Sequence, residues 1–314
     1  MFIDWASLRN PLYSHLGWSV KDACMEWKDG VFYIFTSAFY RDRGRERSHV
    51  VGITTSDWKH FSKPFLHVDG RDGGWTGMCS PNITRVDDAW YLTFNSWGND
   101  HPNGNRNQLF CMKSADLKAW TPPVQVGENL TREIRCIDIA ITHTNGKFYV
   151  MWKDESVFKP RKQYKTRIAT CTSLEGPWAF IGDGYPRFFL RGGGESPLVH
   201  ENYQFIKIDG KQRLLSLDYS PHHPVLYEIG GDPARDESWS TWVDGHDLAI
   251  QRERFNTVHV ANAPFIADWR RHDGHFYMLY AGRTHGLTHA GRGNNKLALS
   301  RSPDLVTWYP PPNT

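Results

Sequence analysis

Short segments in which apolar and polar residues alternate recur along the chain, and tight polar turns separate them. The clearest is Lys21–Ser37, where two predicted strands flank a turn at Lys28-Asp29-Gly30. Alternation with a period of two is typical of a half-buried β-strand. No segment shows the longer period of an extended amphipathic helix. The pattern therefore predicts an all-β chain built from hairpins.

The hairpin occurs five times along the chain. Tyr33, Tyr91 and Tyr149 occupy the same place in three copies and are 58 residues apart. A third predicted strand follows each hairpin and ends in a polar turn with an aromatic residue after it; these aromatics are Phe61, Trp120, Trp178, Trp242 and Trp308. Repeats of about sixty residues with three or four short strands each are the signature of a β-propeller. A β-sandwich with accidental internal similarity is the alternative.

The repeats leave no room for a second domain. We expect residues 1–314 to form one five-bladed β-propeller, with blades at roughly 20–62, 76–121, 134–180, 193–243 and 258–310. The net charge is only +3 with scattered cations, which argues against a nucleic-acid partner. No apolar run approaches the roughly 20 residues that span a membrane.

The N-terminal residues show no signal-peptide pattern, and the five cysteines show no paired spacing. Both observations favour a cytoplasmic protein with reduced, buried thiols. A secreted protein whose leader has been removed would show the same pattern.

Carboxylates mark the predicted first strand of three repeats. Aligned by their starts, the five first strands begin at Asp22, Cys79, Asp138, Glu195 and Asn262. First strands line the channel of a propeller, so Asp22, Asp138 and Glu195 are expected to converge at one mouth. Crowded like charges are costly, which points to a functional site. The alternative is that the two aspartates cap turns and that Glu195 pairs with Arg191 or Arg135.

These motifs resemble glycoside hydrolase family 43 and its clan of arabinanases, arabinofuranosidases and β-xylosidases. The resemblance covers nearly the whole chain. It includes Asn10-Pro11 upstream of Asp22, Ile137-Asp138 before a second hairpin, and Glu195-Ser196-Pro197, which is similar to the family's Glu-small-Pro. The chain departs from the family at Ala23, where a proline usually follows the aspartate.

The resemblance implies cleavage of an arabinose- or xylose-containing plant or algal glycan by an inverting acid/base mechanism. Asp22 would be the general base, Glu195 the general acid, and Asp138 would orient Glu195 and raise its pKa. Inverting enzymes hold base and acid about 6.5–9.5 Å apart to admit water. No cofactor is required, and a calcium or other ion in the central channel, near His259, is left open.

Further residues at the same mouth are candidates for binding an oligosaccharide or polysaccharide. They are Trp75, Trp97, Arg135, Asp218 and Arg283. The tryptophans would stack on sugar faces, unless they pack between blades. The arginines would hydrogen-bond hydroxyl groups, unless they pair with carboxylates.

Three other functions stay open. A related propeller glycosidase could act on galactose- or anhydrogalactose-type sugars. A glycoside phosphorylase would need a basic pocket, which Arg135 and Arg283 could supply, and its turnover would depend on phosphate. A non-catalytic carbohydrate-binding propeller would bind glycan and never release sugar.

Overall fold

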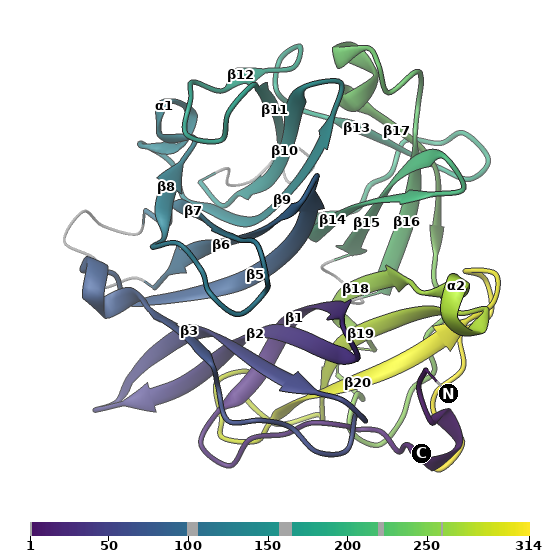
Figure 1. Ribbon diagram of the computed structural model, residues 1–314. Coiled ribbons are helices and arrows are strands. Elements are labelled where there is room, and N and C mark those ends of the chain that lie inside the picture. Colours follow the sequence, from purple (N-terminus) through teal and green to yellow (C-terminus); the bar gives the residue numbers. More distant parts are fainter. Residues whose placement is uncertain (1, 99–105, 157–164, 219–222, 259) are drawn as a thin grey trace.

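The computed structural model describes residues 2–98, 106–156, 165–218, 223–258 and 260–314 (Figure 1). The first repeat contains β1 (Ser19–Lys28), β2 (Val31–Asp42), β3 (Arg45–Thr55) and β4 (Leu66–Asp69). The second contains β5 (Gly77–Val86), β6 (Ala89–Trp97), β7 (Leu109–Ser114) and β8 (Val124–Val126). The third contains β9 (Cys136–Thr144), β10 (Lys147–Asp154), β11 (Thr166–Cys171) and β12 (Ala179–Phe180).

The last two repeats vary this plan. The fourth contains β13 (Arg187–Leu190), β14 (His200–Ile208), β15 (Lys211–Asp218), β16 (His223–Ile229) and β17 (Thr241–Asp247). The fifth contains β18 (Asn262–Asp268), β19 (Phe276–Arg283) and β20 (Asn295–Ser302). The prediction of a mostly β chain is confirmed, and every predicted second and third strand is a strand in the structure.

The strands of each repeat form an antiparallel meander, as their short polar turns require. The exception is β13, which pairs in parallel with β17 at the far edge of the fourth sheet. A single residue pair, Ser48 with Gly77, joins the sheets of the first two repeats. Helices in the described residues are single turns such as α1 (Glu128–Thr131) and α2 (Arg270–Asp273), and none could cross a membrane.

The first strands of the five repeats meet at the centre of the molecule (Figure 1). β1 contacts β5, β5 contacts β9, β9 contacts β14, β14 contacts β18, and β18 contacts β1. Apolar residues fill the spaces between neighbouring sheets; one such cluster contains Phe35, Leu92 and Leu279 from three different repeats. Each sheet therefore presents the same edge to the centre.

Segments from both ends of the chain lie beside the fifth repeat. Tyr13 pairs with Leu297 of β20 as an isolated β-bridge. The ring of Phe2 packs edge-on against Trp27 and Trp269, with centroid distances of 5.3 and 5.4 Å. Asn313 donates a hydrogen bond to the carbonyl of Ala6 at 2.6 Å.

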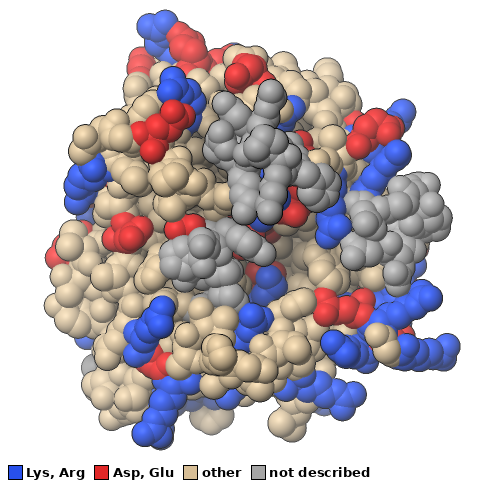
Figure 2. All heavy atoms as spheres, turned by 180° about the vertical axis from the view of Figure 1, so that it is seen from behind, with Lys and Arg blue, Asp and Glu red and all other residues tan. Residues whose placement is uncertain are grey.

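The five cysteines are free and buried, as predicted. Acidic and basic side chains are mixed across the face shown in Figure 2.

Candidate active site

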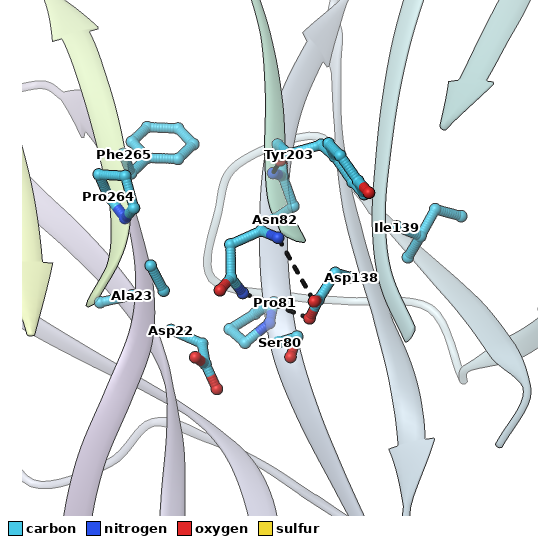
Figure 3. Close-up of a pocket in the computed structure, with 12 residues that line it drawn as sticks. Asp22, Ala23, Ser80, Pro81, Asn82, Asp138, Ile139, Tyr203, Pro264 and Phe265 are labelled. Carbon is cyan, nitrogen blue, oxygen red and sulfur yellow. Dashed lines mark hydrogen bonds between the residues drawn. The ribbon is translucent and has the colours of Figure 1, made fainter. Parts of the chain in front are cut away.

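Each first strand is interrupted at the same place. The register shifts there in all five strands, and one non-glycine residue adopts a left-handed backbone. These residues are Asp22, Ser80, Asp138, Asn202 and Ala263, with φ values of 52°, 55°, 57°, 51° and 47°. A β-bulge bends the strand and re-aims its side chains. All five residues line one inner cavity, shown in Figure 3.

Asp22 lies in the inner cavity without a hydrogen-bonded partner. Its side chain is buried, and neither carboxylate oxygen accepts a hydrogen bond from the described residues. Its one close cation is the ammonium group of Lys21, whose Nζ is 3.1 Å from Oδ1. A buried carboxylate normally has its oxygens satisfied, so Asp22 is available to a water molecule or a substrate hydroxyl.

Asp138 is held by its neighbours. Its Oδ2 accepts a hydrogen bond from the backbone N–H of Asn202, and its Oδ1 accepts one from Asn202 Nδ2, both at 3.3 Å (dashed lines in Figure 3). Burial, followed by the negative charges of Glu201 and Asp22, raises the pKa of Asp138 to about 7, although Lys153 acts in the opposite direction. A proton is therefore retained here near neutral pH.

A second, outer cavity adjoins the first and shares Ser80, Asp138 and Asn202 with it. In four of the repeats, the residue directly before the bulge residue lines this outer cavity. These residues are Lys21, Cys79, Ile137 and Glu201. Aromatic rings of Phe39, Trp97 and His289 form its wall. Phe39 and Trp97 meet edge-on with centroids 5.5 Å apart. The carboxylates thus lie beside a surface suited to the apolar face of a sugar ring.

Glu201 is the third carboxylate of this site. It is buried, and its Oε2 is 2.6 Å from the Nζ of Lys153. Lys153 is itself only 4% exposed and also lies 2.8 Å from Glu155. Burial alone would lower the pKa of Lys21, but the charges of Asp22 and Glu201 raise it above its ordinary value. Two ammonium groups therefore compensate the carboxylates.

The structure corrects the predicted position of Glu195. This residue is exposed, pairs with Arg187 at 3.1 Å, and lines a separate cleft with Tyr185 and Thr241. It precedes β14 and forms a bridge with Phe189 of β13, at the sheet edge opposite β14. The prediction that the fourth first strand starts at Glu195 is wrong, because β14 starts at His200.

One sequence signal could have identified Glu201. Asp22 and Asp138 lie eight residues before the turn glycines Gly30 and Gly146. Counting back eight residues from Gly210 gives Asn202, the bulge residue, with Glu201 directly before it. Aligning the predicted first strands by their starts gives Glu195 instead.

Of the five predicted sugar-binding residues, one lines a cavity of the candidate site. Trp97 lines the outer cavity, whereas Trp75 packs edge-on against Phe110 and lines neither cavity. The other three line neither cavity; they are Arg135, whose N–H donates to Ser156, Asp218 at the end of β15, and Arg283 at the end of β19.

His259 lies outside the described residues. Within those residues, no three His, Cys, Asp or Glu side chains are grouped to hold a metal ion. The predicted channel ion therefore stays a prediction.

Solved structures of other proteins have a fold similar to that of this chain. The sequence matches no protein-family model and no curated protein. A GH43_1 enzyme from Xanthomonas citri complexed with xylose has a similar structure, with a TM-score of 0.65 and 14% identity over 97% of this chain and 93% of that one. A GH43 β-xylosidase/α-arabinofuranosidase from a compost microbial metagenome, in complex with xylotriose, has a TM-score of 0.62 and 15% identity over 97% of both chains.

An exo-1,5-α-L-arabinanase from a bovine ruminal metagenomic library is also similar, with a TM-score of 0.57 and 13% identity over 92% of this chain and 95% of that one. The chain therefore has a fold like that of the family 43 glycoside hydrolases, as its motifs predicted.

Proposed function

We propose that the chain is a five-bladed propeller glycoside hydrolase that inverts the anomeric centre of a xylose- or arabinose-containing glycan. The observation that carries the proposal is the meeting of Asp22, Asp138 and Glu201 where all five first strands converge. The circular order of contacts from β1 through β18 and back to β1 supports the propeller. The similar folds named above include xylosidases and an arabinanase, which supports this class of substrate.

In this proposal Asp22 is the general base. An inverting reaction needs a carboxylate that removes a proton from water on one side of the sugar and an acid on the other side. Asp22 is buried, and both of its oxygens lack hydrogen-bond donors among the described residues. A water molecule in the inner cavity would therefore find an acceptor without first displacing a protein donor.

Glu201 is the proposed general acid, and Asp138 is the neighbouring carboxyl group that supplies its proton. Two neighbouring carboxyl groups in a buried site share a proton more readily than they both ionise. Asp138, with its pKa near 7, keeps that proton in the resting site, where Lys153 neutralises Glu201. Glu201 lines the outer cavity and would deliver the proton to the leaving oxygen, while Asp138, which lines both cavities, would supply it.

The outer cavity is the proposed sugar-binding region. Trp97, which is only partly buried, offers an apolar ring surface supported by Phe39 behind it, and His289 adds a polar group whose Nε2 lies 2.7 Å from Glu46. A sugar ring stacked on this wall would have its glycosidic bond close to Glu201. The solved structures complexed with xylose and xylotriose support a ligand of this kind.

A phosphorylase is the second candidate, because a cation does line the outer cavity. That cation is Lys21, whereas Arg135 and Arg283, the residues predicted to hold phosphate, line neither cavity. Lys21 is already beside Asp22, and Glu201 lines the same cavity and would repel a phosphate dianion. Hydrolysis therefore remains the first proposal.

The test is sugar release by the wild type, Glu201→Gln and Glu195→Gln from aryl glycosides and from arabinan, xylan and agar-type oligosaccharides, with and without phosphate. A general acid contributes roughly 10²–10⁴-fold, so Glu201→Gln should lose about that factor on unactivated substrates. Glu195→Gln, the matched control, should stay within about twofold. NMR should show the inverted anomer.

Other outcomes point elsewhere. If Glu195→Gln inactivates the enzyme and Glu201→Gln does not, the assignment of the acid is wrong. Strict dependence on phosphate would identify a phosphorylase. Binding of glycan without any turnover would identify a carbohydrate-binding protein.

A further inference from the structure

A separate cleft lies beside the fifth repeat. Its walls are the loop 251–255, the N-terminal segment around Arg9, the start of β20, and the C-terminal prolines Pro310–Pro312. Its volume of about 870 Å³ falls within the range of ligand pockets, roughly 300–1,000 Å³. It shares no lining residue with either cavity of the candidate active site.

The charge of this cleft is one-sided. Five charged side chains line it; they are the cations Arg9, Arg252, Arg254 and Lys296 and the carboxylate Glu253. Their net charge of +3 equals the formal net charge of the whole chain. The ion pairs of the described residues include none of the four cations. Such a concentration of one sign produces a local field that attracts anions.

The acidic side chain of this lining, Glu253, is engaged by its neighbours. Oε1 of Glu253 accepts hydrogen bonds from Asn10 Nδ2 and from the hydroxyl of Tyr280, both at 3.3 Å. Oε2 is buried, and burial raises the pKa of Glu253. Arg252 and Arg254, on either side of Glu253 in the sequence, are both exposed. Glu253 therefore does little to neutralise them.

The walls of the cleft are fixed before any ligand arrives. Asn256 is fully buried, and its Nδ2 donates to the carbonyls of Gln251 and Val260 at 3.1 and 2.8 Å. On the facing wall, Asn10 and Leu299 exchange two hydrogen bonds of 2.9 and 3.1 Å. A rigid backbone lowers the entropy lost when a ligand binds.

The chemistry of the lining selects the kind of anion. Arginine forks match carboxylates in two parallel hydrogen bonds. Proteins that bind single-stranded nucleic acids combine a positively charged groove with exposed aromatic rings on which the bases stack. Among the described residues that line this cleft, the one aromatic residue is Phe255, which is 6% exposed. The prolines instead offer aliphatic surface, which suits a sugar backbone.

We propose that this cleft binds a uronate-bearing segment of a glycan chain, outside the candidate active site. The choice of a glycan rests on the proposed function, whereas the preference for a carboxylated polymer rests on the cleft. Binding here would hold an acidic polysaccharide at the enzyme while its neutral sugars reach the outer cavity.

The test measures binding of a fluorescently labelled oligogalacturonate of about ten sugars by anisotropy, at low and at moderate salt. The cleft variant combines Arg9→Gln, Arg252→Gln, Arg254→Gln and Lys296→Gln. The control variant removes four charges elsewhere, by Arg41→Gln, Arg43→Gln, Lys63→Gln and Lys118→Gln. We expect the cleft variant to bind at least tenfold more weakly and the control to bind within about twofold of the wild type, with affinity falling as salt rises.

Both variants should hydrolyse a small aryl glycoside as the wild type does, so loss of binding is separated from loss of catalysis. Binding of the oligogalacturonate without turnover of any glycoside would refute the proposed function but would still support the proposal for the cleft. The proposal for the cleft is overturned if its variant binds like the wild type, if the control loses as much, or if duplex DNA of matched charge binds as tightly as the oligogalacturonate.

Discussion

Replacing Asp138 with Asn should favour the folded state increasingly, relative to the wild type, as the pH rises from 5 to 8. In the unfolded chain the carboxyl ionises through its ordinary pKa of 3.8, whereas in the folded chain it keeps its proton up to about 7. The folded state therefore binds more protons between these values. The contribution of this group to stability is complete below pH 3.8 and is lost as the pH rises through about 7.

The size of the effect follows from the two pKa values. One pKa unit corresponds to about 1.4 kcal/mol, so full ionisation in the folded protein costs about 4 kcal/mol, and roughly 2–3 kcal/mol of this accrues between pH 5 and 8. An asparagine has no such cost. Any constant penalty of the substitution, such as an amide group facing the N–H of Asn202, is equal at both pH values and cancels.

Thermal unfolding followed by circular dichroism gives the measurement. The unfolding entropy of 314 residues is about 0.7 kcal/mol/K. The difference in Tm between Asp138→Asn and the wild type should therefore grow by about 4 °C from pH 5 to pH 8.

Asp304→Asn is the control. Backbone N–H donors of Thr307 and Val306 lower the pKa of Asp304, so its effect should not change over this range. A constant difference in Tm for Asp138→Asn would show that Asp138 is ionised throughout and would refute the assignment of a retained proton.

Three further predictions concern packing and binding. Lys153→Met should lower the free energy of unfolding by about 3–5 kcal/mol, because it leaves the buried carboxylate of Glu201 without its cation. Lys153→Arg should recover much of this, and equal Tm values for the two variants would contradict the prediction. Gly77→Ala should lower the free energy of unfolding by about 1–3 kcal/mol, since the added Cβ would lie 2.3 Å from the Oγ of Ser48. In the control Gly194→Ala the added Cβ meets nothing within 4 Å, so urea unfolding should show a nearly unchanged free energy. Trp97→Ala should raise KM about three- to tenfold through lost stacking, while Trp75→Ala should leave KM nearly unchanged; the reverse order in steady-state kinetics would move the sugar site away from the outer cavity.

The sequence determined the local structure of this protein because strands and turns follow from neighbouring residues. Alternating apolar positions and turn pairs such as Asp29-Gly30 specify a hairpin wherever they occur. Their regular return specified the repeats, and the family motifs pointed to the fold that the structural comparisons show. Asp22 and Asp138 could be aligned because each lies at the same distance from its turn.

Tertiary structure alone decided which carboxylate joined them. The spacing from Gly210 marks Asn202 and its neighbour Glu201, but no local pattern shows that the side chain of Glu201, rather than that of Glu195, reaches the central site. The bulge at Asn202 does, because a shift of one residue in a strand turns a side chain to the opposite face. Lys153 belongs to the site because of a contact between two repeats, which no local spacing encodes: β10 carries its ammonium group to the buried carboxylate of Glu201 on β14.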